Sequence, residues 1–284
     1  MNLYPVVAYL RHLLTARSTA GHGVHSPYVY DFLTKVVRGK TDSKITSQVE
    51  SLRRTMLSDK RSIMVTDLGA GSVTRAGGER RVAEIARTAA LPAKEAGLLA
   101  RMIQGAGYRV NGSGSNVQAS AAPERHMIEP DSIILELGTS LGISTLALAL
   151  AEPERRVITV EGCPALAAIA RENLQRYGAV NAEVWAMEFS AAIESLRNEG
   201  LKVAFAFIDG NHRGTVLAEY VSKIAAMGDN MIIVSDDIRL TKEMFRAWRS
   251  IAESGIAAVS METLRLGILF IKHGITPGRY RIRY

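Results

Sequence analysis

The segment IILELGTSLGIS, residues 133–144, decides the fold of this chain. An apolar run leads into Gly138, a short turn follows, and Gly142 opens the apolar helical segment ISTLALALA. A buried strand that enters a helix through a glycine turn is typical of a doubly wound α/β sheet. The turn also predicts a ligand site, because glycines allow close approach to the backbone and a helix N-terminus offers free N–H groups.

Short apolar runs alternate with helical patterns after this turn. Strands are predicted near residues 132–137, 156–161, 182–187, 203–208 and 230–235, and helices near 143–151, 164–177, 190–199, 213–227 and 240–254. The later segments IAAVSME and RLGILFIK are close enough in sequence to form an antiparallel pair. We therefore expect an α/β fold with a Rossmann-like, mostly parallel sheet and a terminal antiparallel hairpin, the architecture of class I methyltransferases.

The pattern divides the chain into three regions. Residues 1–105 have mainly helical periodicity, with one strand-like stretch, IMVTDL, and with Pro92 interrupting a long helical run. They are predicted to form a helical extension or lid. Residues 106–130 are rich in Gly, Ser and Ala, which is typical of a flexible loop. Residues 131–284 are predicted to form the sheet domain.

Composition is that of an ordinary globular protein, with 47% hydrophobic and 22% charged residues among 284. No apolar run approaches the ~20 residues that span a bilayer, so no membrane partner is expected. The N-terminus reads as an amphipathic helix rather than a signal peptide. Cys163 is the only cysteine, which excludes a disulfide framework. We expect a cytoplasmic protein, and a homodimer is compatible with the sequence.

The net charge of +7 is unevenly distributed. Residues 1–130 hold 18 Lys and Arg against 10 Asp and Glu, whereas residues 131–271 hold 13 against 18. Residues 272–284 add four cationic residues and no acid. A solvated basic face is the simpler interpretation, and an RNA partner is the alternative. The terminal RYRIRY is compatible with an edge strand, a tail or a nucleic-acid-binding strand.

The segment VTDLGAGS, residues 65–72, looks like a second glycine turn but lacks the context of the first. A basic, glycine-rich stretch follows it, and then a long helix with no second strand behind it. A glycine motif predicts a ligand site only between a strand and a helix of the sheet. We interpret this segment as a structural turn or as part of a lid over the substrate pocket.

The turn after residue 137 favours S-adenosyl-L-methionine over NAD. The dinucleotide fingerprint G-x-G-x-x-G has a second glycine that admits a pyrophosphate, and Thr139 stands in its place here. Ser144, in the first helical turn, could reach a ligand carboxylate. Glu161 ends the next strand, where it could accept hydrogen bonds from both hydroxyls of a ribose.

Carboxylates also follow the fourth and fifth predicted strands. Asp209 ends the fourth, with His212 three residues on, and Asp236 and Asp237 end the fifth. Three carboxylates at one sheet edge repel one another unless a positive charge lies between them, and oxygen ligands suit Mg²⁺ or a similar hard cation. A cation there could acidify a substrate hydroxyl, with His212 as general base. The simpler alternative is that the two adjacent aspartates cap a helix and that His212 only begins one.

ELGTSLGIS, VEGCP, FIDGNH and SDDI together resemble the class I, metal-dependent O-methyltransferases, which include the catechol and macrolide-sugar enzymes. The resemblance covers roughly residues 94–272. It implies cofactor contacts from Glu136, Gly138, Thr139, Ser140, Gly142, Ser144, Glu161, Gly162 and Asp209, and an adenine pocket formed by Glu188, Phe189 and Ser190. It further implies metal ligation by Asp209, Asp236 and Asp237, and catalysis by Asp209 and His212.

The first ninety residues resemble a different group, uncharacterised bacterial methyltransferase-like proteins that carry the same HGVHSPYVYDF and DLGAGS segments. Taken together, the sequence predicts an enzyme that methylates a hydroxyl of a small molecule with S-adenosyl-L-methionine and a divalent cation. Two alternatives stay open: methylation of an RNA such as tRNA, and a non-catalytic S-adenosylmethionine-binding protein.

Overall fold

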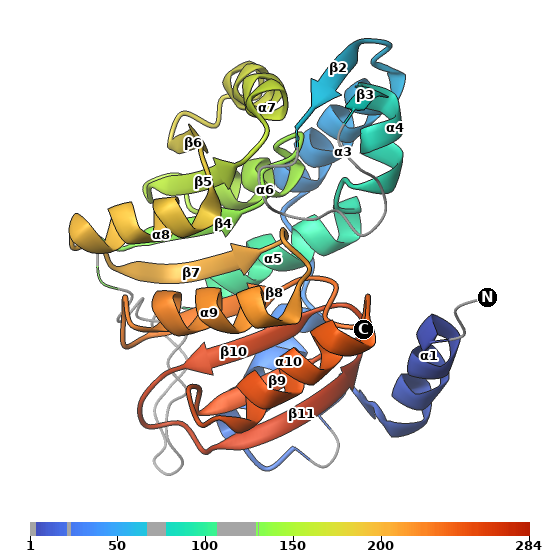
Figure 1. Cartoon of the computed structure of the whole chain (residues 1–284). Helices are drawn as coiled ribbons and strands as arrows, with labels where there is room; N and C mark the ends of the chain where they lie inside the picture. The colour runs from blue at the N-terminus through green and yellow to red at the C-terminus, as the bar shows by residue number, and fades with distance from the viewer. Residues whose placement is uncertain (1–3, 22–23, 67–77, 107–128, 130) are drawn as a thin grey trace.

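A nine-stranded sheet forms the centre of the computed structural model, which describes residues 4–21, 24–66, 78–106, 129 and 131–284 (Figure 1). The strand order is β1-β11-β9-β10-β8-β7-β4-β5-β6. The strands are β1 (Arg17–Ser18), β4 (Ile133–Leu137), β5 (Val157–Glu161), β6 (Ala182–Ala186), β7 (Val203–Ile208), β8 (Met231–Ser235), β9 (Val259–Glu262), β10 (Gly267–Ile271) and β11 (Gly278–Arg283).

The register confirms the expected architecture. Strands β4 to β8 pair in parallel, and β10 is antiparallel to both β8 and β9. The five predicted parallel strands and the terminal hairpin are all present. Every residue of β4, β7 and β8 is buried, as is expected for central strands covered on both faces.

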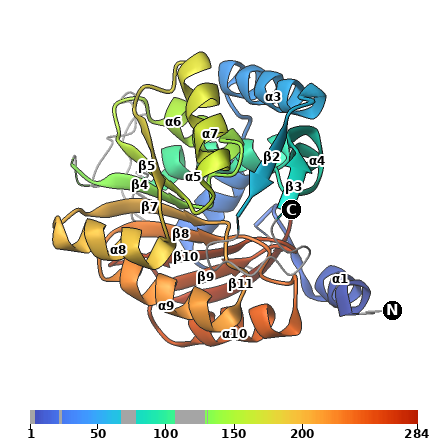
Figure 2. The ribbon, with the colours of Figure 1, turned by 45° about the horizontal axis from the view of Figure 1, so that its top comes forward.

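Helices cover both faces of the sheet (Figure 2). α5 (Ala93–Ala106), α6 (Ile143–Ala151) and α7 (Pro164–Arg176) lie on one face, and α8 (Phe189–Asn198), α9 (Gly214–Ala225) and α10 (Lys242–Glu253) lie on the other. Alternate strand residues supply the two cores, so that Ile134 packs with the first set and Leu135 with the second.

The connections after β4 and β7 leave in opposite directions, and ligands of such sheets bind at the carboxyl edge between strands arranged in this way. The two turns touch there. Gly138 has a φ of +106°, and a Cβ on it would lie 2.2 Å from the carbonyl oxygen of Asp209. Only glycine therefore allows the two strand ends to approach this closely.

The N-terminal residues extend the same hydrophobic core. They form α1 (Tyr4–Thr15), α2 (Pro27–Asp31), the π-helix η1 (Phe32–Val37), α3 (Ser43–Ser58) and α4 (Val82–Thr88). Ser26 caps α2, and Tyr28 and Phe32 meet the ring of Phe270 edge-on, at 5.5 and 4.8 Å between centroids. The conspicuous HSPYVYDF segment thus anchors the N-terminal region on β10. The predicted break at Pro92 is confirmed between α4 and α5.

One expectation for this region is wrong. A second strand does follow IMVTDL, because β2 (Ser62–Val65) pairs antiparallel with β3 (Gly78–Arg81). β3 has the sequence GERR and lies in a two-stranded sheet, so it shows no apolar alternation that sequence could reveal. Residues 67–77, which include most of the VTDLGAGS segment, and most of the predicted flexible loop lie outside the described residues.

The C-terminal RYRIRY is a sheet strand. β11 pairs in parallel with β9 on one side and with the two-residue β1 on the other. The basic N-terminal and C-terminal segments therefore meet at one end of the sheet, where α1 packs beside β11 (Figure 1). Among the described residues, no helix combines the length and apolarity that crossing a bilayer requires.

Candidate functional site

The turn between β4 and α6 leaves polar backbone groups available. Gly142 is the N-cap of α6, with a φ of +80° and no side-chain hydrogen bond to the first N–H groups of the helix. Ser140 also has a positive φ of +49°, a strained conformation for a residue with a side chain. An uncapped helix start attracts a carboxylate or another anionic group.

Two buried polar atoms beside this turn have no partner among the described residues. Glu136 is fully buried at the end of β4, and its Oε2 accepts hydrogen bonds from Thr145 and, at 2.6 Å, from Thr159. Its Oε1 and the Oγ of Ser140 have none. Burial raises the pKa of Glu136. These atoms fit the amino-acid end of S-adenosylmethionine, whose ammonium and carboxylate would satisfy acceptors and donors respectively.

Glu161, at the end of β5, faces the same turn. Its Oε2 accepts a hydrogen bond from the N–H of Ser140 at 2.8 Å, and its Oε1 accepts one from the N–H of Cys163 at 2.9 Å. Gly162 lies between Glu161 and Cys163 in the sequence. Burial raises the pKa of Glu161, and the backbone N–H groups oppose that shift. Each carboxylate oxygen can accept a further hydrogen bond, so the fixed carboxylate suits a pair of ribose hydroxyls.

The position of β2 at this edge could not be read from the sequence. The Sγ of Cys163 accepts a hydrogen bond from the N–H of Thr66 at 3.5 Å, directly after β2. The end of β2 is thereby held next to Glu161. The only signal in the sequence is the single cysteine, Cys163, two residues after Glu161, and a cysteine alone does not identify the segment that contacts it.

The residues expected around adenine follow β6, which is the neighbour of β5. Glu188 caps α8 by accepting from the N–H of Ala191 at 3.2 Å. Phe189 is largely buried, packs against Gly210 and meets the ring of Tyr220 edge-on at 6.1 Å. Glu188, Phe189 and Ser190 thus lie at the same carboxyl edge of the sheet as Glu161. Their contact with adenine stays a prediction.

The three predicted metal ligands do come together, but around a guanidinium. Arg265, in the turn between β9 and β10, donates from Nε and Nη2 to the two oxygens of Asp236, each at 2.5 Å. Its Nε also lies 3.3 Å from Oδ1 of Asp237. The Asp236 side chain is fully buried, whereas that of Arg265 is 35% exposed. Sequence reasoning missed Arg265, which lies 29 residues from Asp236.

The charges of this cluster perturb one another. Burial raises the pKa of Asp209 well above its ordinary value, and the charges of Asp236 and Asp237 raise it further, while Arg265 opposes them. Burial and Asp236 likewise raise the pKa of Asp237. Burial acts to lower the pKa of Arg265, but its bonds to Asp236 raise it above the ordinary value. Asp209 is therefore the carboxyl most inclined to hold a proton.

A divalent cation does not fit this arrangement. Both oxygens of Asp236 are engaged by Arg265, which supplies the positive charge that the sequence led us to expect from Mg²⁺. Among the described residues, no group of three His, Cys, Asp or Glu side chains is arranged to hold a metal ion. The metal ligation predicted for Asp209, Asp236 and Asp237 therefore has no support in this arrangement. Sequence cannot show which cation neutralises a carboxylate cluster.

His212 lies in the segment between β7 and α9, three residues after Asp209. It follows Asn211, which has a φ of +54°, and precedes α9. A positive charge on His212 acts to lower the pKa of Asp237, so the two side chains lie near one another. The predicted base and the predicted carboxylates are thus in one place, separated from Glu136 and Glu161 by the contact between Gly138 and Asp209.

Replacing Asp209 by Asn should stabilise the ligand-free protein and do so more at high pH. A carboxyl whose folded pKa is raised contributes stability below its unfolded pKa and loses it as pH rises through the folded pKa. The amide removes that cost. The thermal midpoint of the variant should exceed that of the wild type by more at pH 8 than at pH 5. Each kcal/mol of stability corresponds to roughly 2–4 °C. An equal shift at both pH values would contradict the raised pKa.

The comparisons with known proteins agree with this geometry. Residues 135–238 match the family model of a methyltransferase domain. The O-methyltransferase TomG from Streptomyces achromogenes, solved with S-adenosylmethionine, superposes with a TM-score of 0.51 at 17% identity, covering 86% of this chain and 95% of that one. An O-methyltransferase from Bacillus cereus in complex with SAH also gives 0.51, at 16% identity, with 86% and 96% covered. No curated protein sequence matches significantly.

The carboxyl edge of β4, β5, β7 and β8 and the strand order together define a class I methyltransferase fold. The segment that is similar to a methyltransferase domain, residues 135–238, runs from β4 to just beyond Asp237.

Proposed function

We propose that the protein is an S-adenosylmethionine-dependent O-methyltransferase that acts on a hydroxyl of a small molecule without a divalent cation. One observation carries the proposal. Two buried polar atoms that have no partner among the described residues, Glu136 Oε1 and Ser140 Oγ, lie on one side of the contact between Gly138 and Asp209, and the carboxylate cluster with His212 lies on the other. A cofactor side and an acceptor side thus adjoin.

When bound, the cofactor supplies a methyl group on a positively charged sulfur. The chain's part is to hold it: the uncapped start of α6 and Glu136 at the amino-acid end, Glu161 at the ribose, and Glu188, Phe189 and Ser190 around adenine. Thr139 and Gly142 shape the turn between them. Catalysis of a direct displacement consists largely of such positioning and of excluding water.

On the acceptor side, His212 would take the proton from the attacking hydroxyl. Asp237 lies near His212, so its negative charge would stabilise the imidazolium that forms. Asp209, with its raised pKa, can remain protonated and donate a hydrogen bond to the acceptor oxygen. Arg265 holds Asp236 and Asp237 in place, and its positive charge offsets their negative charges.

The neighbouring structures support the acceptor class. TomG is involved in tomaymycin synthesis, which implies a small-molecule acceptor for that protein. Neither the family model nor these neighbours points to RNA, and the cluster beside Asp209 is negatively charged, which disfavours a phosphate backbone at the acceptor.

The test separates the two sides of the site. Wild-type protein should bind S-adenosylhomocysteine in a calorimetric titration and should produce it from S-adenosylmethionine with a hydroxylated aromatic or sugar acceptor. Glu161→Ala should lose binding at least tenfold, because the ribose hydroxyls lose their acceptor. His212→Ala should keep binding and lose kcat by roughly 10²–10⁴-fold.

Glu183→Ala is the matched control, since Glu183 lies on β6 in an exposed ion pair with Arg156 and should change neither quantity. Absence of nucleoside binding by wild-type protein would overturn the proposal. Binding without transfer to any hydroxyl would instead identify a non-catalytic binding protein.

A further inference from the structure

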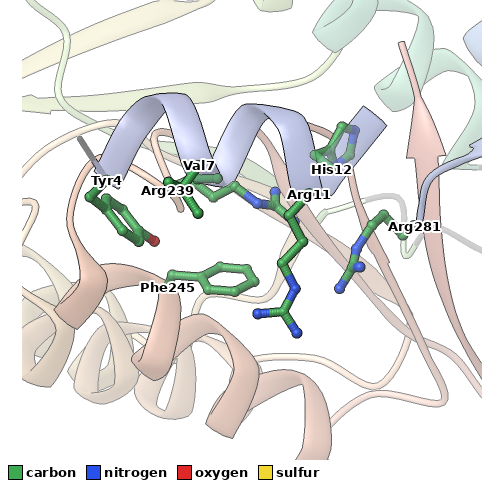
Figure 3. A pocket seen from close by; sticks show the side chains of 8 residues that line it. Tyr4, Val7, Arg11, His12, Arg239, Phe245 and Arg281 are labelled. Carbon is green, nitrogen blue, oxygen red and sulfur yellow. The ribbon is translucent and has the colours of Figure 1, made fainter. Parts of the chain in front are cut away.

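A cavity of about 80 Å³ lies between α1 and the C-terminal part of the sheet (Figure 3), and its lining includes none of the residues of the candidate site. It is formed by the N-terminal helix, the segment after β8, α10 and β11. The lining residues are Tyr4, Val7, Ala8, Arg11, His12, Arg239, Phe245 and Arg281. None of them has a part in the proposed methyl transfer.

Three guanidinium groups line this cavity against one carboxylate. Arg239 Nη2 donates to Oε1 of Glu262 at 2.8 Å, and Arg281 Nε donates to the same oxygen. The other Glu262 oxygen accepts from Trp248 Nε1 at 2.8 Å. Within the described part of the chain, Arg11 forms no ion pair. Two positive charges are therefore left without a counter-charge.

The pKa shifts of the lining groups reflect this excess. Burial lowers the pKa of His12, and the charges of Arg239 and Arg281 lower it further, with Glu262 opposing them. Burial also lowers the pKa of Arg239, and so does the charge of Arg281. His12 therefore experiences a positive potential, whereas at Arg239 the effect of Glu262 exceeds that of Arg281. An anion in the cavity would be stabilised by that potential.

The cavity is also built to hold its polar groups in place. Arg239 donates to the carbonyl of Thr263 and stacks on Phe245, 4.6 Å from the ring centroid. His12 is 3% exposed; its Nε2 lies 3.1 Å from the carbonyl oxygen of Ile282, and its Nδ1 has no partner among the described residues. Figure 3 shows Arg11 and Arg281 directed toward the same space, on the Phe245 side. Arginines fixed in this way need little reordering on binding.

We propose that this cavity binds the phosphate of a small phosphomonoester. The dianion matches the two uncompensated charges, and guanidinium groups present paired donors that suit phosphate oxygens. The volume admits a group of this size and little more. Phe245 and Tyr4 provide an apolar wall for the part of the ligand that adjoins the phosphate. The site is a cavity rather than an open basic surface, which favours a small molecule over a nucleic acid strand.

Calorimetric titration of phenyl phosphate into the full-length protein tests this directly. Wild-type protein should bind one equivalent. Arg11→Gln should weaken binding at least tenfold, since it removes an uncompensated charge at an exposed position whose side chain has no ion pair to lose. Val7→Glu, at a position 58% exposed, should abolish binding because its carboxylate would enter the cavity in place of the ligand.

Arg279→Gln is the matched control. Arg279 lies on β11 two residues before Arg281 and is 65% exposed, but it does not line the cavity. It should leave binding unchanged. Unaltered S-adenosylhomocysteine binding by Arg11→Gln shows that the fold is kept and separates this test from that of the methyltransferase. Absence of heat with phenyl phosphate would overturn the proposal. Equal losses of phenyl phosphate affinity in Arg11→Gln and Arg279→Gln would overturn it in favour of a diffuse basic surface. So would a single-stranded RNA that binds more tightly than phenyl phosphate and loses affinity equally in the two variants.

Discussion

Arg265→Ala should lower the free energy of unfolding by about 3 kcal/mol, because it leaves the fully buried carboxylate of Asp236 without its partner. The expected value is at the lower end for a buried ion pair, since Arg265 itself is partly exposed. Urea unfolding without added metal measures it. Arg249→Ala is the control: Arg249 pairs with Glu253 on the surface of α10, and its loss should cost less than about 1 kcal/mol.

The same variant tests whether Arg265 takes the place of a cation in the carboxylate cluster. Without the guanidinium, Asp209, Asp236 and Asp237 are free to bind a cation, so millimolar Mg²⁺ should restore part of the lost stability. A ligand present at a hundred times its Kd adds about 2.7 kcal/mol. The thermal midpoint of the wild type should respond to neither Mg²⁺ nor chelator. A wild-type midpoint that rises with Mg²⁺ would show that the cation displaces Arg265, and the metal-free proposal would then be abandoned.

Gly138→Ala should be the most damaging small substitution in the site. The added Cβ would lie 2.2 Å from the carbonyl oxygen of Asp209, so the ends of β4 and β7 would have to separate. The φ of +106° adds strain for any residue with a side chain. We expect a loss of about 3 kcal/mol or more in unfolding free energy and the disappearance of S-adenosylhomocysteine binding.

Gly178→Ala separates backbone strain from this collision. Gly178 also has a positive φ, +72°, but a Cβ there meets nothing within 4 Å. Its substitution should cost about 1–2 kcal/mol and leave nucleoside binding intact. If the two variants were equally stable, the contact between the two turns would not be what constrains residue 138.

Most of the sheet was predictable because central parallel strands are apolar on both faces. Runs such as VAFAFI of β7 and MIIVS of β8 have no other common use between helical patterns. The aspartates at their ends could also be placed together, since parallel strands end at one edge. Chain order and apolar pattern were sufficient for these features.

Arg265 was not predictable from spacing, because its position depends on register. The β9–β10 hairpin was expected, but only the pairing of Gly267 with Ser235 brings residue 265 beside Asp236 and Asp237. Sequence fixes which segments alternate, and it does not fix where an antiparallel strand aligns on its neighbour. The same applies to the cavity between α1 and β11, whose lining comes from residues more than two hundred positions apart.

The pairing of β1 with β11 has a consequence for how the chain is made. Arg17 and Ser18 are synthesised more than 260 residues before their strand partners, Ile282 and Arg283. Until β11 has been synthesised, α1 therefore has no strand to dock against. A nascent chain stalled shortly before residue 278 should carry a completed parallel sheet and an undocked first helix.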